Sequence, residues 1–145
     1  MAKFLTSLLL FMSFVSFAQT KGTTDKDKER IDSVCDNFMK AFEIGNISES
    51  LQLLKQNSVL APSALDSLQN TINYQLNTLL IPTYGKILSS EFIREHKIKN
   101  IIAKRFYILK FEKFYLKFEF TLYNNGTGWT ITSFIYNEDL IELLY

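Results

Sequence analysis

Apolar residues in the first half of the chain recur every three to four positions, as they do on one face of a helix. This spacing predicts a first helix over 29–44, which Gly45 ends, and a shorter second helix after Asn46. A third helix is predicted over 64–81, with Ser63 and Asp66 as its N-terminal cap and Pro82 and Gly85 ending it. The apolar positions of the three helices are, in order, Ile31, Val34, Cys35, Phe38 and Phe42; Ile47, Leu51 and Leu54; and Leu65, Leu68, Ile72, Leu76 and Leu79.

After Gly85 the period of the pattern changes to two, which is typical of strands. Strands are predicted over 86–96, 99–111, 114–123 and 128–137, joined by short turns into an antiparallel meander. In the third strand one face carries Phe114, Leu116, Phe118, Phe120 and Leu122, and the other carries Tyr115, Lys117, Glu119, Thr121 and Tyr123. We expect the first face to be core and the second to be largely in water. The pattern leaves residues 139–145 undecided between a strand extension and a short turn.

The order of these elements predicts an α+β fold in which N-terminal helices pack across a curved antiparallel sheet of about four strands. Several stretches resemble the NTF2-like (cystatin-like, cone-shaped) superfamily, in particular its small secreted bacterial proteins of uncharacterised function. These stretches are 38–46, 84–86, 105–110, 118–123 and 128–129, and the resemblance covers about residues 29–140. It implies a cone that often encloses a pocket, but no single activity, because the superfamily includes isomerases, dehydratases, transport adaptors and proteins without a known ligand.

The first eighteen residues have the pattern of a secretory signal peptide. Lys3 precedes an apolar run that ends at Phe17, and Ser16 and Ala18 are the small residues that signal peptidase reads. We therefore expect cleavage near Ala18, export to the periplasm or the medium of a bacterium, a polar flexible leader over 19–28 and one domain over 29–145. A lipoprotein signal needs a cysteine just after the apolar run, and Cys35 lies well inside the domain, so lipid anchoring is not expected.

Charge and cysteine content narrow the function classes further. Lys+Arg number 16 against 15 Asp+Glu, and removal of residues 1–18, which contain Lys3 and no acid, leaves 15 against 15. A mature net charge of zero argues against nucleic acid or a membrane surface as a partner. Cys35 is the only cysteine, so no internal disulfide can form, and its place on an apolar helical stripe predicts a buried side chain.

No catalytic residue, metal site or cofactor is predicted. His96 is the only histidine, and the charged residues around it indicate an exposed position without a nucleophile or metal partner. The acids on the predicted helices are interpreted as solvated faces or caps: Asp32, Asp36, Glu43 and Asp66. The catalytic groups of the steroid-isomerase branch of the superfamily cannot be mapped onto this sequence residue by residue.

Tyrosine and tryptophan offer the best candidates for a binding site, because each combines apolar area with a polar group. Most of them are expected to be core or cross-strand partners. We select Tyr84, Tyr107 and Trp129 as candidate ligand-binding residues, since each is placed to approach the mouth of a cone.

Three functional hypotheses follow. The leading one is an exported, non-enzymatic domain that binds a small apolar ligand or a protein partner. The second is a small isomerase or hydrolase of NTF2-like type, which requires a buried acid facing a tyrosine inside a pocket. The third is a structural module that forms a homodimer through the outer sheet face, where Tyr115, Thr121 and Tyr123 lie.

Overall fold

The computed structural model describes residues 19–145, so the predicted signal peptide over 1–18 lies outside the described residues. The elements in chain order are α1 (Gln19–Glu43), α2 (Ile47–Asn57), α3 (Pro62–Tyr74), the π-helix η1 (Gln75–Leu80), α4 (Ile81–Tyr84), β1 (Ile87–Ile98), β2 (Ile102–Phe111), β3 (Tyr115–Asn124), β4 (Trp129–Asn137) and α5 (Ile141–Leu144).

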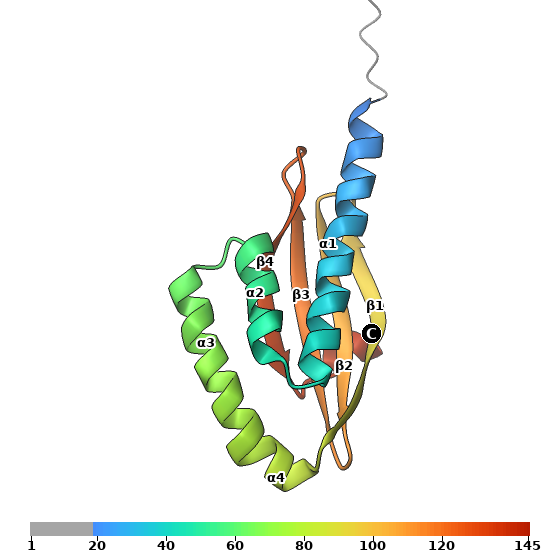
Figure 1. The fold of residues 1–145 in the computed structure, drawn as a ribbon. Helices are drawn as coiled ribbons and strands as arrows, with labels where there is room; N and C mark the ends of the chain where they lie inside the picture. The colour runs from blue at the N-terminus through green and yellow to red at the C-terminus, as the bar shows by residue number, and fades with distance from the viewer. Residues whose placement is uncertain (1–18) are drawn as a thin grey trace, which may run out of the picture.

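The strands form one antiparallel sheet in the order β1-β2-β3-β4. Helices α1 and α2 lie across one face of this sheet, and α3 lies outside α2 (Figure 1). The predicted α+β class, with helices packed on a curved four-stranded sheet, is confirmed. Each strand begins and ends within a few residues of its predicted bounds, because alternation of apolar and polar positions is strong in this half of the chain.

Aromatic side chains from α1, β3 and β4 make the middle of the core. The rings of Phe38 and Phe120 meet edge to face at 5.2 Å, and those of Phe42 and Phe118 at 4.9 Å. Phe134 of β4 packs against Phe38 at 4.9 Å. Edge-to-face contacts of this kind add to the stabilisation that burial itself provides. Cys35 is buried, as the sequence predicted.

Helix α1 begins ten residues earlier than its predicted start at residue 29, at Gln19. The segment 19–28, predicted to be a flexible leader, is helical, and its last residues contact the sheet. Asp27 accepts the backbone N–H of Trp129 at 2.5 Å, and the ammonium of Lys28 lies 2.8 Å from Glu95. These contacts join residues far apart in sequence, so the polar composition of the segment gave no sign of them.

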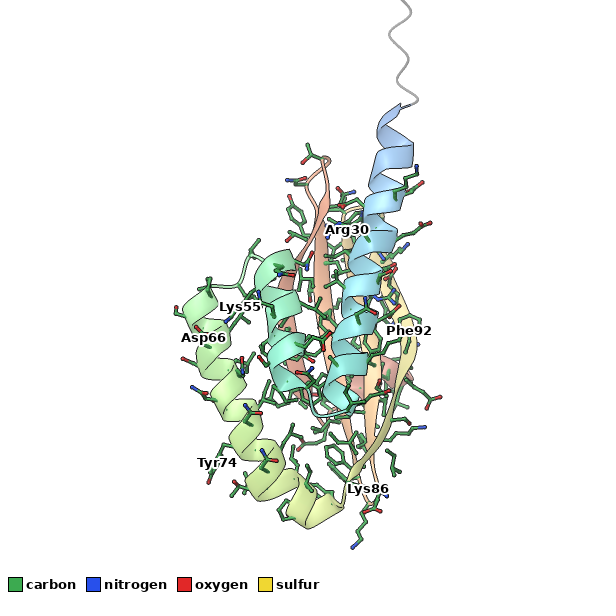
Figure 2. The ribbon with its side chains drawn as sticks, viewed as in Figure 1. Arg30, Lys55, Asp66, Tyr74, Lys86 and Phe92 are labelled. Carbon is green, nitrogen blue, oxygen red and sulfur yellow. The ribbon has the colours of Figure 1, made fainter. Side chains whose placement is uncertain are left out.

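The third predicted helix differs at both ends. It starts at Pro62, with Ala61 as an N-cap that makes no side-chain hydrogen bond, so the predicted cap of Ser63 and Asp66 is absent. Asp66 instead forms an ion pair with Lys55 of α2, and Figure 2 shows the two side chains side by side between α2 and α3. At the other end the helical path runs past Pro82 to Tyr84 by way of η1.

The outer face of the sheet is less exposed to solvent than predicted. Lys117 and Glu119, expected in water, are 2% and 3% exposed. Helix α5 lies behind the sheet, on the face opposite to α1 and α2 (Figure 1), and its Glu142 contacts Lys104 at 3.3 Å. Lys104 in turn lies 2.8 Å from Glu119, so the carboxylate is buried with a charge partner, as buried ions require.

Candidate functional site

Two of the hollows in the described residues lie between the helices and the sheet. The first, which we call the mouth pocket, has a volume of about 280 Å³ and is lined by Gln75, Leu79, Leu80, Leu116, Tyr136, Asn137 and Glu138. The second, which we call the charged groove, has a volume of about 330 Å³ and is lined by Asp36, Met39, Lys40, Glu43, Ser90, Phe92, Arg105 and Tyr107. Both volumes are near the lower end of the ~300–1,000 Å³ typical of small-molecule sites.

The mouth pocket is built on the π-helix. The backbone N–H of Ile81 donates to Leu76, a bond across five residues, and Pro82 follows with no N–H to continue the α-helical ladder. The wider turn supplies Gln75, Leu79 and Leu80 to one wall of the pocket. Single π-turns inside helices occur often at functional sites, so the π-helix supports the mouth pocket as a candidate binding site.

The opposite wall of the mouth pocket comes from the ends of β3 and β4. Leu116 supplies apolar surface, and the Tyr136 hydroxyl donates to Oε1 of Gln75 at 2.6 Å across the pocket. Burial raises the pKa of Tyr136, so the phenol stays protonated as a donor at neutral pH. The pocket therefore combines three leucine side chains and one fixed polar bridge with two further polar residues, Asn137 and Glu138, a lining suited to a ligand with an apolar body.

The charged groove lies between α1 and the strands β1 and β2. Asp36 Oδ1 accepts the Tyr107 hydroxyl at 2.5 Å and Nη2 of Arg105 at 3.1 Å, and Arg105 Nε donates to the Tyr107 oxygen at 3.1 Å. Burial and the hydrogen bond to Asp36 raise the pKa of Tyr107, which therefore remains a protonated donor. These three side chains form a closed network on the groove wall.

A further set of ion pairs continues the network behind the groove. Nη1 of Arg105 lies 3.1 Å from Glu95 and 3.3 Å from Asp32, and the Lys28 ammonium reaches the same two carboxylates. Burial alone would raise the pKa of Glu95, but the hydrogen bonds and charges of Lys28 and Arg105 outweigh it and hold that pKa below its usual value. The Glu95 carboxylate is therefore ionised at neutral pH, and each Arg105 nitrogen has at least one acceptor.

The outer part of the charged groove is formed by Glu43, Ser90 and Phe92. Oε2 of Glu43 accepts the backbone N–H and the hydroxyl of Ser90, both at 2.7 Å, which fixes the carboxylate against β1. The Phe92 ring is 48% exposed, lies 4.4 Å from the Arg105 guanidinium and marks the β1 side of the groove in Figure 2. An exposed aromatic ring beside fixed carboxylates offers a ligand both apolar and charged contacts.

The three aromatic residues selected from the sequence lie in different places. Tyr107 lines the charged groove. Tyr84 stacks on Phe114 at 4.4 Å where α4 leads into the sheet. Trp129 is buried at the start of β4, with the Lys28 ammonium 5.5 Å from the centre of its ring, and its Nε1 has no hydrogen-bond partner. The structure thus brings none of the three together in one site.

Other residues in the two hollows carried weaker signals in the sequence. Asp36 and Glu43, interpreted there as solvated helix acids, both line the charged groove. Their spacing of seven residues places both acids on one face of the helix, and this spacing was the only feature of the sequence that indicated a shared site. His96, by contrast, is exposed at the end of β1, as predicted.

Two properties of the described residues, 19–145, bear on the kind of site. Within that range no cluster of three His, Cys, Asp or Glu side chains has an arrangement that could hold a metal ion. No helix in the same range combines the length and apolar character needed to cross a bilayer.

In comparisons with known proteins, no family model, curated protein or solved structure matches the chain.

Proposed function

We propose that this chain is an exported, non-enzymatic binding domain of the NTF2-like superfamily, and that it takes a small apolar ligand in the mouth pocket. The observation that carries the proposal is the wall of leucines on the π-helix, facing Leu116 and Tyr136 across about 280 Å³. The sequence pattern of the first eighteen residues supports export, and the order of helices and sheet supports the superfamily.

An apolar ligand fits this pocket for a physical reason. Leu79 is 50% exposed in the described structure, and covering exposed leucine surface yields about 25 cal/mol for each Å² removed from water. The hydrogen bond from the Tyr136 hydroxyl to Oε1 of Gln75 gives the phenol proton and the amide oxygen a partner, so an apolar group placed against these two atoms leaves neither of them unpaired.

The first test is a titration with the neutral fluorescent probe N-phenyl-1-naphthylamine. We expect saturable binding that Leu79→Glu weakens at least about tenfold, because the new carboxylate would have to be desolvated in the pocket. Leu88→Glu is the matched control, since Leu88 is exposed to a similar degree, 55%, but lies on β1 away from the pocket. Equal loss in both variants, or no saturable binding, would contradict the proposal.

Native mass spectrometry of the protein purified from its own host complements the titration. A bound small molecule that is lost in Leu79→Glu would identify the ligand chemistry directly. A clean dimer mass, or capture with a protein partner and no small ligand, would favour the protein-partner or homodimer hypothesis instead.

A second candidate function, a small isomerase or hydrolase, has one observation in its favour. It requires an acid facing a tyrosine in a pocket, and Asp36 and Tyr107 meet in the charged groove. We place it second because the Tyr107 proton is already directed to Asp36, and each Arg105 nitrogen already donates to Tyr107 or to a carboxylate. Neither side chain beside Asp36 is therefore a free, preorganised donor for a developing oxyanion. Turnover of activated esters or enolisable ketones that Asp36→Asn abolishes would reverse this order.

A further inference from the structure

The wall of the mouth pocket carries hydrogen-bond donors that no described side chain accepts. The Tyr136 hydroxyl donates to Oε1 of Gln75 at 2.6 Å, which uses the phenol proton and the amide oxygen. The NH₂ group of the same amide, at Nε2, has no partner among the described residues. Both residues line the pocket, so the pair can offer a donor to a ligand there.

The spare donors do not depend on which side chain donates within the pair. A tyrosine hydroxyl and a glutamine amide together carry three donor hydrogens, and one hydrogen bond between them uses one. If the amide turned over, Nε2 would donate to the phenol oxygen and the phenol proton would be free instead. In either arrangement Gln75 and Tyr136 keep donors that no described side chain accepts.

The pair is held in place before a ligand arrives. The Tyr136 ring stacks on Phe118 with 5.7 Å between ring centres, and Phe118 is fully buried. Gln75 is the first residue of η1, and its amide is bound to the Tyr136 hydroxyl from the opposite wall. Preorganised groups lose little side-chain entropy on binding, so a hydrogen bond from this pair to a ligand retains more of its strength.

An apolar ligand covers these donors, so it must also supply an acceptor. Gln75 is half-buried, and its Nε2 is not among the fully buried side-chain atoms without a partner, which in the described residues are Arg94 Nε and Trp129 Nε1. Water therefore reaches Nε2 in the empty pocket. A ligand placed against the leucines displaces that water, and a buried N–H without a partner costs as much as a lost hydrogen bond.

The charge of the lining favours an uncharged acceptor over an anion. Glu138 lines the pocket and forms no ion pair among the described residues, and the lining residues include no lysine or arginine. A carboxylate or sulfonate bound there would lose its water without gaining a counterion and would meet the charge of Glu138.

We propose that the mouth pocket takes an apolar molecule with one uncharged hydrogen-bond acceptor, such as the carbonyl of an ester or a ketone, and that the free donor of the Gln75 and Tyr136 pair binds this acceptor. The inference rests on the proposed function of the pocket and names the class of its ligand.

The test is a fluorescence titration of the protein with three naphthalene probes. The ketone probe is 6-propionyl-2-(dimethylamino)naphthalene, and the probe without a carbonyl is N-phenyl-1-naphthylamine. The third, 8-anilinonaphthalene-1-sulfonate, is N-phenyl-1-naphthylamine with an added sulfonate. We expect saturable binding of both neutral probes, and binding of the sulfonate that is at least about tenfold weaker than that of N-phenyl-1-naphthylamine.

A double variant tests the polar pair itself. Gln75→Met with Tyr136→Phe preserves the approximate size of both side chains and removes the donors of both. The two are changed together because the loss of Gln75 alone would free the Tyr136 proton to serve as the donor. Affinity for the ketone probe should fall about three- to tenfold, and affinity for N-phenyl-1-naphthylamine should stay within about twofold. The matched control is Gln69→Met with Tyr123→Phe, the same change outside the pocket, which should alter neither affinity.

The outcomes separate this inference from the proposed function. If N-phenyl-1-naphthylamine binds but the double variant weakens both neutral probes by the same factor, or the sulfonate binds as tightly, the pocket stays an apolar site and the inference is overturned. Binding of neither neutral probe contradicts the proposed function and the inference with it.

Amide NMR of the unchanged protein gives a measurement that does not require the variant to fold. The side-chain NH₂ protons of Gln75 should shift downfield with the ketone probe and not with N-phenyl-1-naphthylamine. The same shift with both probes would overturn the inference.

Discussion

Arg105 holds together the ion-pair network behind the charged groove, and its removal gives the sharpest stability prediction. The guanidinium is 8% exposed and contacts Asp32, Asp36 and Glu95 within 3.3 Å. Arg105→Met keeps a long apolar side chain of similar reach, so the change removes chiefly the charge and its hydrogen bonds rather than the packing.

The size of the effect follows from what the substitution leaves behind. Lys28 would remain beside Asp32 and Glu95, and the more exposed Lys97 would remain 3.4 Å from Glu95. Asp36 would keep only the Tyr107 hydrogen bond. Breaking a buried ion pair by removing one partner costs about 3–5 kcal/mol, because the other charge stays buried without compensation. Since Asp36 is 44% exposed, water would solvate part of its charge, and we expect about 3 kcal/mol at pH 7.

The stability lost in Arg105→Met should be larger at pH 7 than at pH 4. The folded-state pKa of Glu95 lies below its unfolded value, so the carboxylate contributes stability that is present above about pH 4.3 and is lost as the pH falls through the lowered folded pKa. Without Arg105 that pKa rises, and protonation removes the uncompensated charge. The difference between the variant and the parent should therefore shrink as the pH is lowered from 7 to 4.

Urea unfolding at pH 7 and pH 4, followed by the fluorescence of the single tryptophan, Trp129, measures the stability loss and its change with pH. Lys110→Met on the same strand is the control, because its ion pair with Glu91 is exposed and should matter by less than about 0.5 kcal/mol. A loss below about 1 kcal/mol for Arg105→Met at pH 7, or a loss that is the same at both pH values, would refute this account of the network.

Two further predictions concern the core and the turns. Phe38→Ala should lower the free energy of unfolding by about 3–5 kcal/mol in the same urea assay, because Phe38 is fully buried, whereas Ile44→Ala at a 76% exposed position should change it by less than about 0.5 kcal/mol; similar losses for both would contradict the described packing. Gly85→Ala should lower the thermal midpoint of unfolding more than Gly45→Ala does. Both glycines have positive φ, but only at Gly85 would a Cβ collide with Glu112. A midpoint that is lower for Gly45→Ala than for Gly85→Ala would count against this reasoning.

The strands could be predicted from the sequence because the apolar alternation of β3 is local and uninterrupted. Phe118 and Phe120 lie on the core face as expected, and both are fully buried. The same alternation could not predict the burial of Lys117 and Glu119, which depends on contacts between elements. Lys104 of β2 pairs with Glu119 and with Glu142 of α5, a segment whose pattern allowed either a strand or a turn. The alternation of apolar and polar residues decides which face of a strand is apolar, but tertiary contacts decide which side chains are shielded from water.

The candidate sites were harder to predict for a related reason. Asp36 and Tyr107 are separated by 71 positions, and only the packing of α1 on β2 brings them within hydrogen-bond distance. The mouth pocket depends on a π-helix. Apolar residues spaced three and four positions apart predict an ordinary α-helix there, so the sequence pattern could not indicate the wider turn. Tyr136, which spans that pocket, had no feature in the sequence that separated it from the other tyrosines.

The contact between Asp27 and Trp129 has a consequence for the order in which the chain folds. The sheet is a meander whose neighbouring strands are consecutive, so each hairpin can form as soon as its second strand has been synthesised. Helix α1, however, is tied to the start of β4 across 102 positions. The last contacts of the first helix, those of Asp27 with Trp129 and of Phe38 with Phe134, must therefore wait for the last strand. Until then part of its apolar stripe is available to chaperones or to other chains.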